Sequence, residues 1–144
     1  MSHVRKLIRD NIVTTVTGLT TTASRVYKTR IYPLETGKLP GLCVYTKSET
    51  SEMQTMTMPR TQMRVLDVMV EAYVQGTDDA LDTIAVEVEE ALATDVTRGG
   101  YAKDTEVVDF EADFSGEGEK PFSVGRFTVR VTYMTVENDV ETAV

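Results

Sequence analysis

Apolar and polar residues alternate along the chain from Gln62 until Gly76. Polar positions such as Asp67 and Glu71 separate the apolar ones, as expected for a strand with one buried face. The apolar positions are Leu66, Val68, Val70, Ala72 and Val74. The pattern therefore predicts a long, half-buried strand over residues 62–75.

The apolar spacing changes after Gly76, and a helix is expected to run as far as Thr94. Thr77 is suited to cap this helix, and the two aspartates that follow are favourable against the helix dipole. Its apolar residues recur every three or four positions, which predicts one buried stripe and an acidic opposite face. The stripe consists of Leu81, Ile84, Ala85, Val88, Ala91 and Leu92.

Similar patterns predict a first helix and four more strands. Ser2 can cap a helix over residues 3–16, whose apolar stripe is Val4, Leu7, Ile8, Ile12 and Val16. Strands are expected over residues 25–32, 42–46, 105–114 and 123–136. In the third of these the inward residues are expected to be Val108, Phe110, Ala112 and Phe114. Its alternate residues, Asp109, Glu111 and Asp113, should face Arg126 and Arg130 across a hairpin.

Residues 47–61 break these patterns, because they are polar apart from three methionines and contain Pro59. They predict a flexible arm, for which two interpretations remain open. The methionines could lie on an extended hairpin that contacts a partner, or Met56 and Met58 could simply begin the next strand. Residues 137–144 are expected to form a loose tail.

The predicted order is α–β–β–(arm)–β–α–β–β within one domain of 144 residues. Short connections favour a mostly antiparallel sheet, and both amphipathic helices are expected to pack on one face of it. The predicted class is therefore α+β. The other face of the sheet carries charges and threonines, so it is either solvated or covered by a neighbouring subunit.

Residues with catalytic chemistry are scarce. His3 is the only histidine and is expected to be a mobile surface residue, while the lone Cys43 is expected to be buried. The Cys/His spacing of a metal site and the glycine loop of a phosphate site are both missing. No apolar run approaches the roughly 20 residues of a membrane-spanning helix, and no secretory signal is recognisable. We therefore expect no enzymatic activity, no metal and no cofactor.

The net charge of −8 is unevenly distributed. Residues 1–72 carry ten Lys/Arg and six Asp/Glu, whereas residues 73–144 carry five and seventeen. A pI near 4.7 argues against sequence-specific DNA binding. The asymmetry would suit copies of the chain that pair head to tail, although the charges could equally solvate the surface.

Four stretches together resemble the tail terminator proteins of long-tailed, siphovirus-type phages, the family of the lambda minor tail protein U. They are VRKLIRDNIVTTVTGL, RVYKTRIYPLETGKLPGLCVYTKSE, VLDVMVEAYVQGTDDALDTIAVEVEEAL and VDFEADFSGEGEKPFSVGRFTVRVTYMT. The most specific piece is LPGLCVYT at residues 39–46. The chain departs from the family pattern at Gly41 and Met134, where small alanine-like and basic residues are usual.

The resemblance implies a structural virion protein, an α+β protomer of a homohexameric ring that is assembled in the host cytoplasm. Such a ring sits on the head-proximal end of the tail tube, stops tube polymerisation and presents a surface for head–tail joining. Its partners would be the tail tube protein and a head-completion or neck protein, with DNA passing through the lumen. Two alternatives are a head-closure or tail tube protein of the same virion, and a small ligand-binding regulatory domain.

The expected interaction residues fall into two groups, for which plain solvation is the competing interpretation. Residues of the arm are expected to contact the tube or an adjacent subunit: Met53, Met56, Met58 and Arg60. Basic residues of the first helix are expected to meet the acidic second helix of a neighbour: Arg5, Lys6 and Arg9, against Asp82, Glu87, Glu89 or Glu90. The second-helix acids and the loop SGEGEK (residues 115–120) are both candidates to line the lumen.

Overall fold

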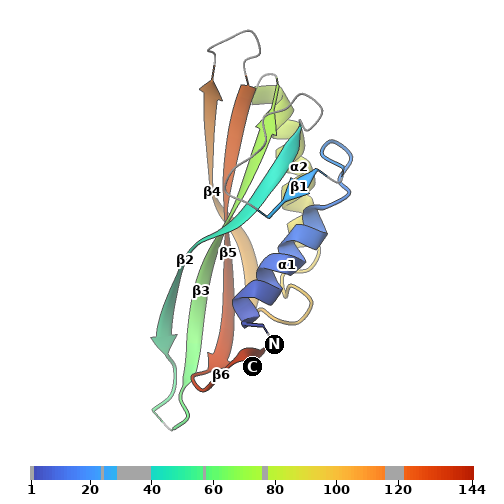
Figure 1. Cartoon of the computed structure of the whole chain (residues 1–144). Helices are drawn as coiled ribbons and strands as arrows, with labels where there is room; N and C mark the ends of the chain where they lie inside the picture. The colour runs from blue at the N-terminus through green and yellow to red at the C-terminus, as the bar shows by residue number, and fades with distance from the viewer. Residues whose placement is uncertain (1, 24, 29–39, 57, 76–77, 116–121) are drawn as a thin grey trace.

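The computed structural model describes residues 2–23, 25–28, 40–56, 58–75, 78–115 and 122–144. Within them the chain is an α+β protein with two helices and a six-stranded, mostly antiparallel sheet, the class predicted from the sequence. Both helices lie on one side of the sheet (Figure 1). The elements are α1 (Val4–Val16), β1 (Val26–Tyr27), β2 (Gly41–Met53), β3 (Thr61–Val74), α2 (Asp78–Ala93), β4 (Asp104–Ser115), β5 (Phe122–Val136) and β6 (Asp139–Ala143).

The strands are ordered β1-β2-β3-β5-β4 across the sheet, and β6 pairs with the end of β5. The alternating strand predicted over residues 62–75 is β3, which lies at the centre and pairs along its length with β2 and β5. The β1–β2 pair is parallel, whereas the other pairs are antiparallel. β3 shows a clear alternation of apolar and polar residues because it lies at the centre of the sheet. The apolar side chains of this alternation point to the face that packs on the two helices.

One hydrophobic core joins the two helices to the sheet. The helical residues that it buries are Val4, Ile8, Ile12 and Val16 of α1, with Leu81, Ile84, Val88 and Leu92 of α2. Each such side chain stabilises the fold by about 1.5–3 kcal/mol relative to an exposed one. Leu7, Ala85 and Ala91, which were also assigned to the stripes, are only partly buried. Thr77, the expected cap of α2, lies outside the described residues.

The prediction of an arm over residues 47–61 was wrong for residues 47–53, which are strand, whereas residues 54–56 and 58–60 lie between β2 and β3. β2 continues to Met53, which lies opposite Gln62 at the far end of the β2–β3 pair. The pattern failed here because the strand is paired through its backbone and carries polar side chains. The interpretation that Met56 and Met58 begin the next strand is also wrong, since β3 begins at Thr61.

The tail expected to be loose over residues 137–144 contains β6 instead. Thr135 of β5 lies opposite Ala143, and the amide of Glu137 donates to the carbonyl of Arg60 at 2.8 Å. Pairing with a neighbouring strand orders this segment although its residues are polar. Only Val26 and Tyr27 of the strand predicted over residues 25–32 are described as strand, and residues 29–39 lie outside the described residues.

The N-terminus of α1 differs from the prediction. His3, not Ser2, caps the helix, and its Nδ1 accepts a hydrogen bond from the amide of Arg5 at 3.0 Å. Burial is the largest cause that lowers the pKa of His3, and the nearby cation of Arg5 adds to it. The imidazole is therefore held in the neutral form, which can accept this bond, and it is not a frayed surface residue.

A bulge changes the inward residues of β4. The register shifts between Val107 and Asp109, so Val107 packs against the core while Val108 remains 39% exposed. The prediction that Val108 points inward was therefore wrong, because a bulge inserts one residue into the alternation. Phe110 does contact the core, with its ring centroid 5.0 Å from that of Phe127. The structure describes the backbone of Phe114 but not its side chain, so the prediction for Phe114 is not tested.

Candidate functional site

The β2–β3 hairpin extends past both helices and ends in a group of methionines (Figure 1). We call residues 53–56 and 58–60 the hairpin tip. Met56 is 94% exposed and Met58 is 70% exposed, and Met53 is also exposed. Flexible, polarisable methionine side chains adapt to apolar surfaces of varied shape. The tip is therefore suited to contact another protein.

The hairpin tip is attached to the rest of the sheet by Arg60. Its Nε lies 3.0 Å from Oε2 of Glu137, between β5 and β6. Arg60, expected from the sequence to be a contact residue, therefore has a partner within the chain. This ion pair fixes the base of the tip, and a contact of Arg60 with a partner stays a prediction.

A polar network centred on Glu49 fixes the hairpin against α1. One carboxylate oxygen of Glu49 lies 2.5 Å from Nη1 of Arg5 and 3.1 Å from Nη1 of Arg64, and the other accepts from the hydroxyl of Tyr133. Arg64 also donates to Thr135 at 3.0 Å. These contacts replace hydrophobic packing where the core ends, and they hold the hairpin in one orientation.

The basic residues of α1 have partners within the chain. Arg5 binds Glu49, the ammonium of Lys6 lies 2.6 Å from Asp10, and Arg9 donates to the hydroxyl of Thr46 at 2.8 Å. The structure thus brings the predicted trio to one side of α1 but uses much of its hydrogen-bonding capacity internally. Of the three, Lys6 is the most exposed.

The acidic residues of α2 divide into two groups. Asp82, Glu89 and Glu90 are exposed. Glu87 instead turns toward the loop after α1, where its Oε1 accepts from the amide of Thr21 at 3.1 Å and its Oε2 is buried without a hydrogen-bond partner among the described residues. Glu87 therefore makes an internal contact, and its contact with a neighbouring copy stays a prediction.

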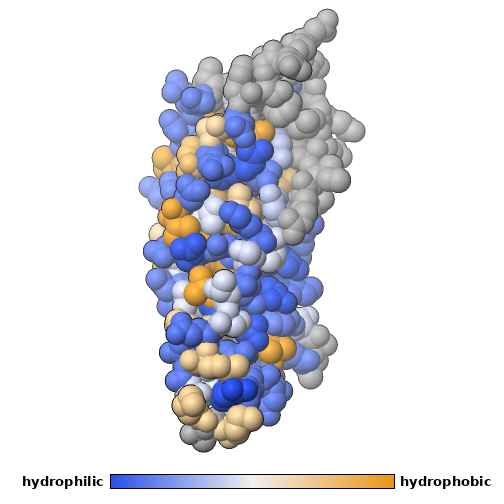
Figure 2. Space-filling view, turned by 90° about the vertical axis from the view of Figure 1, so that its left-hand side faces the viewer, coloured by the Kyte–Doolittle hydropathy of each residue, from blue (hydrophilic) through white to orange (hydrophobic). Residues whose placement is uncertain are grey.

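The face of the sheet that the helices leave open is covered mostly by hydrophilic residues, with small hydrophobic groups between them (Figure 2). At its centre the buried carboxylate of Glu71 accepts from the hydroxyls of Tyr45 and Tyr73, the latter at 2.6 Å. Arg126 lies 3.7 Å from Glu71 and also binds Asp113. Side-chain contacts between strands therefore join β2, β3, β4 and β5 at this part of the open face.

Cross-strand charges on this face follow part of the predicted pattern. Glu111 lies opposite Arg126 as expected, whereas Arg130 binds Asp67 of β3 through two contacts of 3.0 and 3.3 Å. The nearby Cys43 is buried, as predicted, and burial raises the pKa of its thiol to about 12. A thiol of this kind is unreactive at neutral pH.

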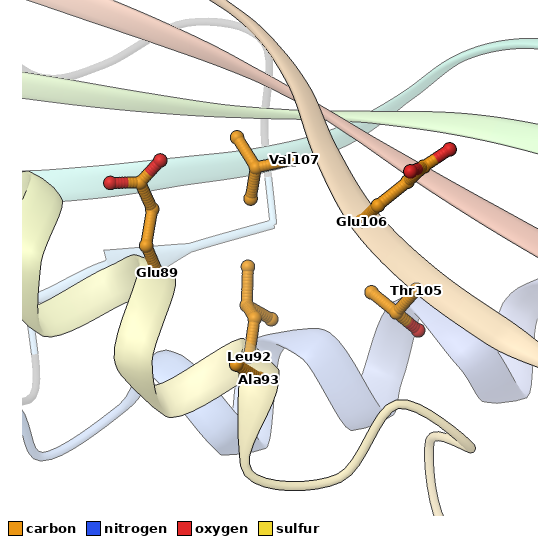
Figure 3. Close-up of a pocket in the computed structure, with 6 residues that line it drawn as sticks. All are labelled: Glu89, Leu92, Ala93, Thr105, Glu106 and Val107. Atoms are coloured by element: carbon orange, nitrogen blue, oxygen red, sulfur yellow. The ribbon is translucent and has the colours of Figure 1, made fainter.

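Two cavities of opposite charge lie near opposite edges of the sheet. One, of about 200 Å³, lies between α2 and β4; Glu89, Leu92 and Val107 line it, and the side chain of Glu106 at its border points away from α2 (Figure 3). The other, of about 420 Å³, lies between α1 and β2 and is lined by Lys6, Arg9, Asp10, Lys28, Val44, Tyr45 and Thr46. The sequence pattern could not find either cavity, because each combines residues from distant segments.

Arg98 is a structural residue that sequence reasoning missed. It is fully buried, and its guanidinium donates to the carbonyl of Leu92 at 2.6 Å and to that of Asp95. Carbonyls at the end of a helix lack partners within the helix and carry its negative dipole end, so a cation there is favourable. Burial lowers the pKa of Arg98. A basic residue shortly after a predicted helix was the available signal.

No protein-family model and no curated protein matches the chain. Across the described part of the chain, no three His, Cys, Asp or Glu side chains are grouped as a metal site requires. The helices formed by these residues are too short or too polar to cross a membrane. Function therefore has to be inferred from the surfaces of the protein itself.

Proposed function

We propose that this chain is a tail terminator of a long-tailed phage. Six copies would form a ring on the head-proximal end of the tail tube, stop tube polymerisation and present a surface for head–tail joining. The observation that carries the proposal is the β2–β3 hairpin, which extends past both helices and ends in exposed methionines (Figure 1). The sequence resembles tail terminators, and in a tail terminator ring such a hairpin could contact the tail tube.

The hairpin is suited to dock because it is held in place before binding. Its strands are paired from Gly41 to Met53, the Glu49 network attaches it to α1, and Arg60 binds Glu137. A preorganised contact loses less conformational entropy on binding than a flexible arm does. We propose that Met56 and Met58 bury their side chains against the terminal subunits of the tube and so block further addition.

The open face of the sheet supports a second part of the proposal. Carboxylates outnumber arginines there, especially along β4, where Asp109 and Glu111 are exposed. An acidic wall repels the phosphates of DNA and would let the genome pass without being retained. We therefore propose that this face, rather than α2, lines the lumen.

The proposal is tested with purified full-length chain and tail tubes assembled from the tube protein of the phage that encodes it. Electron microscopy of the mixture is expected to show density on one end of each tube, and tubes incubated with the chain are expected to stop growing. Size measurements should give a hexamer, free in solution or on the tube end.

The alternatives predict different results in this experiment. A tube protein would polymerise into long tubes by itself, and a head-closure protein would bind DNA-filled heads instead of tubes. A compact monomer that ignores tubes and retains a small anionic molecule, for which the basic 420 Å³ cavity would be the natural place, would overturn the proposal.

A further inference from the structure

We infer that neighbouring copies in the ring join edge to edge, with β2 of one protomer beside β4 of the next. This inference rests on the proposed function, since it specifies the contact that would close the ring. We call Lys6, Arg9, Lys28 and Lys47 the basic edge, and Glu89 and Glu106 the acidic edge. The two edges lie on opposite sides of the same sheet.

Among the described residues, β2 along most of its length and β4 each have one side that pairs with no other strand. β1 covers β2 only at Leu42 and Cys43, and no other described strand pairs with the outer side of β2 as far as Met53. Within the part of the chain that the structure describes, β4 pairs with β5 alone. An unpaired strand presents a row of backbone donors and acceptors that can bind another strand, and charged side chains restrict which strand it accepts.

The basic edge keeps an excess of positive charge. Asp10 is shared by the ammonium groups of Lys6 at 2.6 Å and Lys28 at 2.8 Å. The cavity beside β2 thus contains three cations, including Arg9, but one carboxylate. Lys47 adds an exposed ammonium at the register shift of β2 and has no acidic partner among the described residues.

The acidic edge combines negative charge with exposed apolar surface. Glu89 and Glu106 border the cavity between α2 and β4, and Val108 and Phe110 are 39% and 40% exposed on the same strand. Partly exposed apolar residues beside like charges are unfavourable in an isolated protomer. The lysines of a neighbour's basic edge would suit this surface. Their aliphatic stems would cover the apolar side chains, and their ammonium groups would pair with the carboxylates.

Strand direction and charge select the same arrangement. β2 is antiparallel to β3, β3 to β5 and β5 to β4, so β2 and β4 run in opposite directions. If the ring axis runs along the strands, its rotation leaves the direction of every strand unchanged. β2 of one copy and β4 of the next therefore also run in opposite directions and would form an antiparallel pair. Two basic edges or two acidic edges would repel, so the favoured contact is head to tail, the kind that closes a ring.

The test uses charge reversal in the full-length chain. Lys47→Glu reverses the exposed cation of the basic edge, and Glu89→Lys with Glu106→Lys reverses the acidic edge. Each variant is expected to weaken association at least about tenfold, measured by sedimentation over a range of concentrations and on tube ends. The triple variant sets Lys47→Glu on one edge against Glu89→Lys and Glu106→Lys on the other, and it is expected to recover part of the association that the double variant loses.

A matched control for the double variant is Asp139→Lys with Glu141→Lys, which makes the same change in net charge at exposed positions of β6, away from the acidic edge. This control should associate like the wild type. The inference is overturned if the control weakens association equally, if the triple variant fails to recover, or if the wild type remains monomeric with and without tubes.

The outcomes also separate this inference from the proposed function. Rings that respond to the edge variants but never cap tubes would retain the edge contact and reject the terminator role. Edge variants that cap tubes as well as the wild type does would reject the edge contact and retain the role.

Discussion

The sheet is stabilised in two different ways along its length. Where α1 and α2 cover it, apolar side chains such as Ile84 and Phe127 are fully buried in one core. Toward the end of the β2–β3 hairpin, the core gives way to the network of Glu49, Arg5 and Arg64, and then to exposed methionines. Buried apolar side chains therefore stabilise one region, whereas the other exposes apolar side chains that add little to stability, and mutations can separate the two.

The largest effect on stability is expected in the helix-covered region. Ile84→Ala removes a fully buried side chain of α2 and should lower the free energy of unfolding by about 2–5 kcal/mol. Urea denaturation measures this loss. Val86→Ala, at a 54% exposed position of the same helix, is the control. Equal effects of the two changes would contradict the division into two regions.

A smaller effect is expected where the network replaces the core. Glu49→Gln removes the charge that binds Arg5 and Arg64 and should cost about 1–3 kcal/mol in unfolding free energy. Glu52→Gln, at an exposed position on the same strand, should stay within about 0.5 kcal/mol of the wild type. If both variants unfold alike, the network does not stabilise the hairpin.

The sequence predicted the elements that bury apolar side chains and missed the strands whose side chains are polar. The core elements α1, β3 and α2 were predicted because their apolar residues repeat at the period of a helix or a strand. Strand residues 47–53 and 139–143 were missed because they are polar and are ordered by pairing. The bulge at Val107 also leaves no signal in an alternating pattern.

The candidate site was predicted only in part. The exposed methionines were identified from the sequence, although the choice between a hairpin and the start of a strand needed the structure. The internal partners of Arg5 and Glu87 could not be predicted, since they come from distant segments or from loop backbone. The two charged edges required the strand order.

A still smaller effect is expected at His3, where α1 begins next to the Glu49 network. His3→Ala removes the cap on the amide of Arg5 and should cost about 1 kcal/mol at pH 8. Because the folded-state pKa of His3 is lowered from 6.5, its stabilisation is present above pH 6.5. It is lost as the pH falls through the folded-state pKa.

Urea denaturation of the wild type and His3→Ala from pH 8 to pH 5 measures this dependence. The difference between the two proteins should shrink as the pH falls. A difference that is constant or grows toward low pH would show that the imidazole does not act as a neutral cap.

The smallest effect on stability is expected at the hairpin tip, where Met56→Ser with Met58→Ser changes only exposed side chains. The free energy of unfolding should stay within about 0.5 kcal/mol of the wild type. Binding should nevertheless be lost, because the apolar contact surface is removed. Val86→Ser supplies the control for removing an exposed apolar side chain elsewhere.

The most direct measurement of the central claim is the fraction of tail tubes capped by each protein, counted by electron microscopy at equal concentration. The wild type and Val86→Ser are expected to cap tubes and stop their growth, while the folded methionine variant leaves the ends free. Capping by the methionine variant at the wild-type level would show that the hairpin tip does not bind the tube. Failure of the wild type to cap tubes would contradict the proposed function.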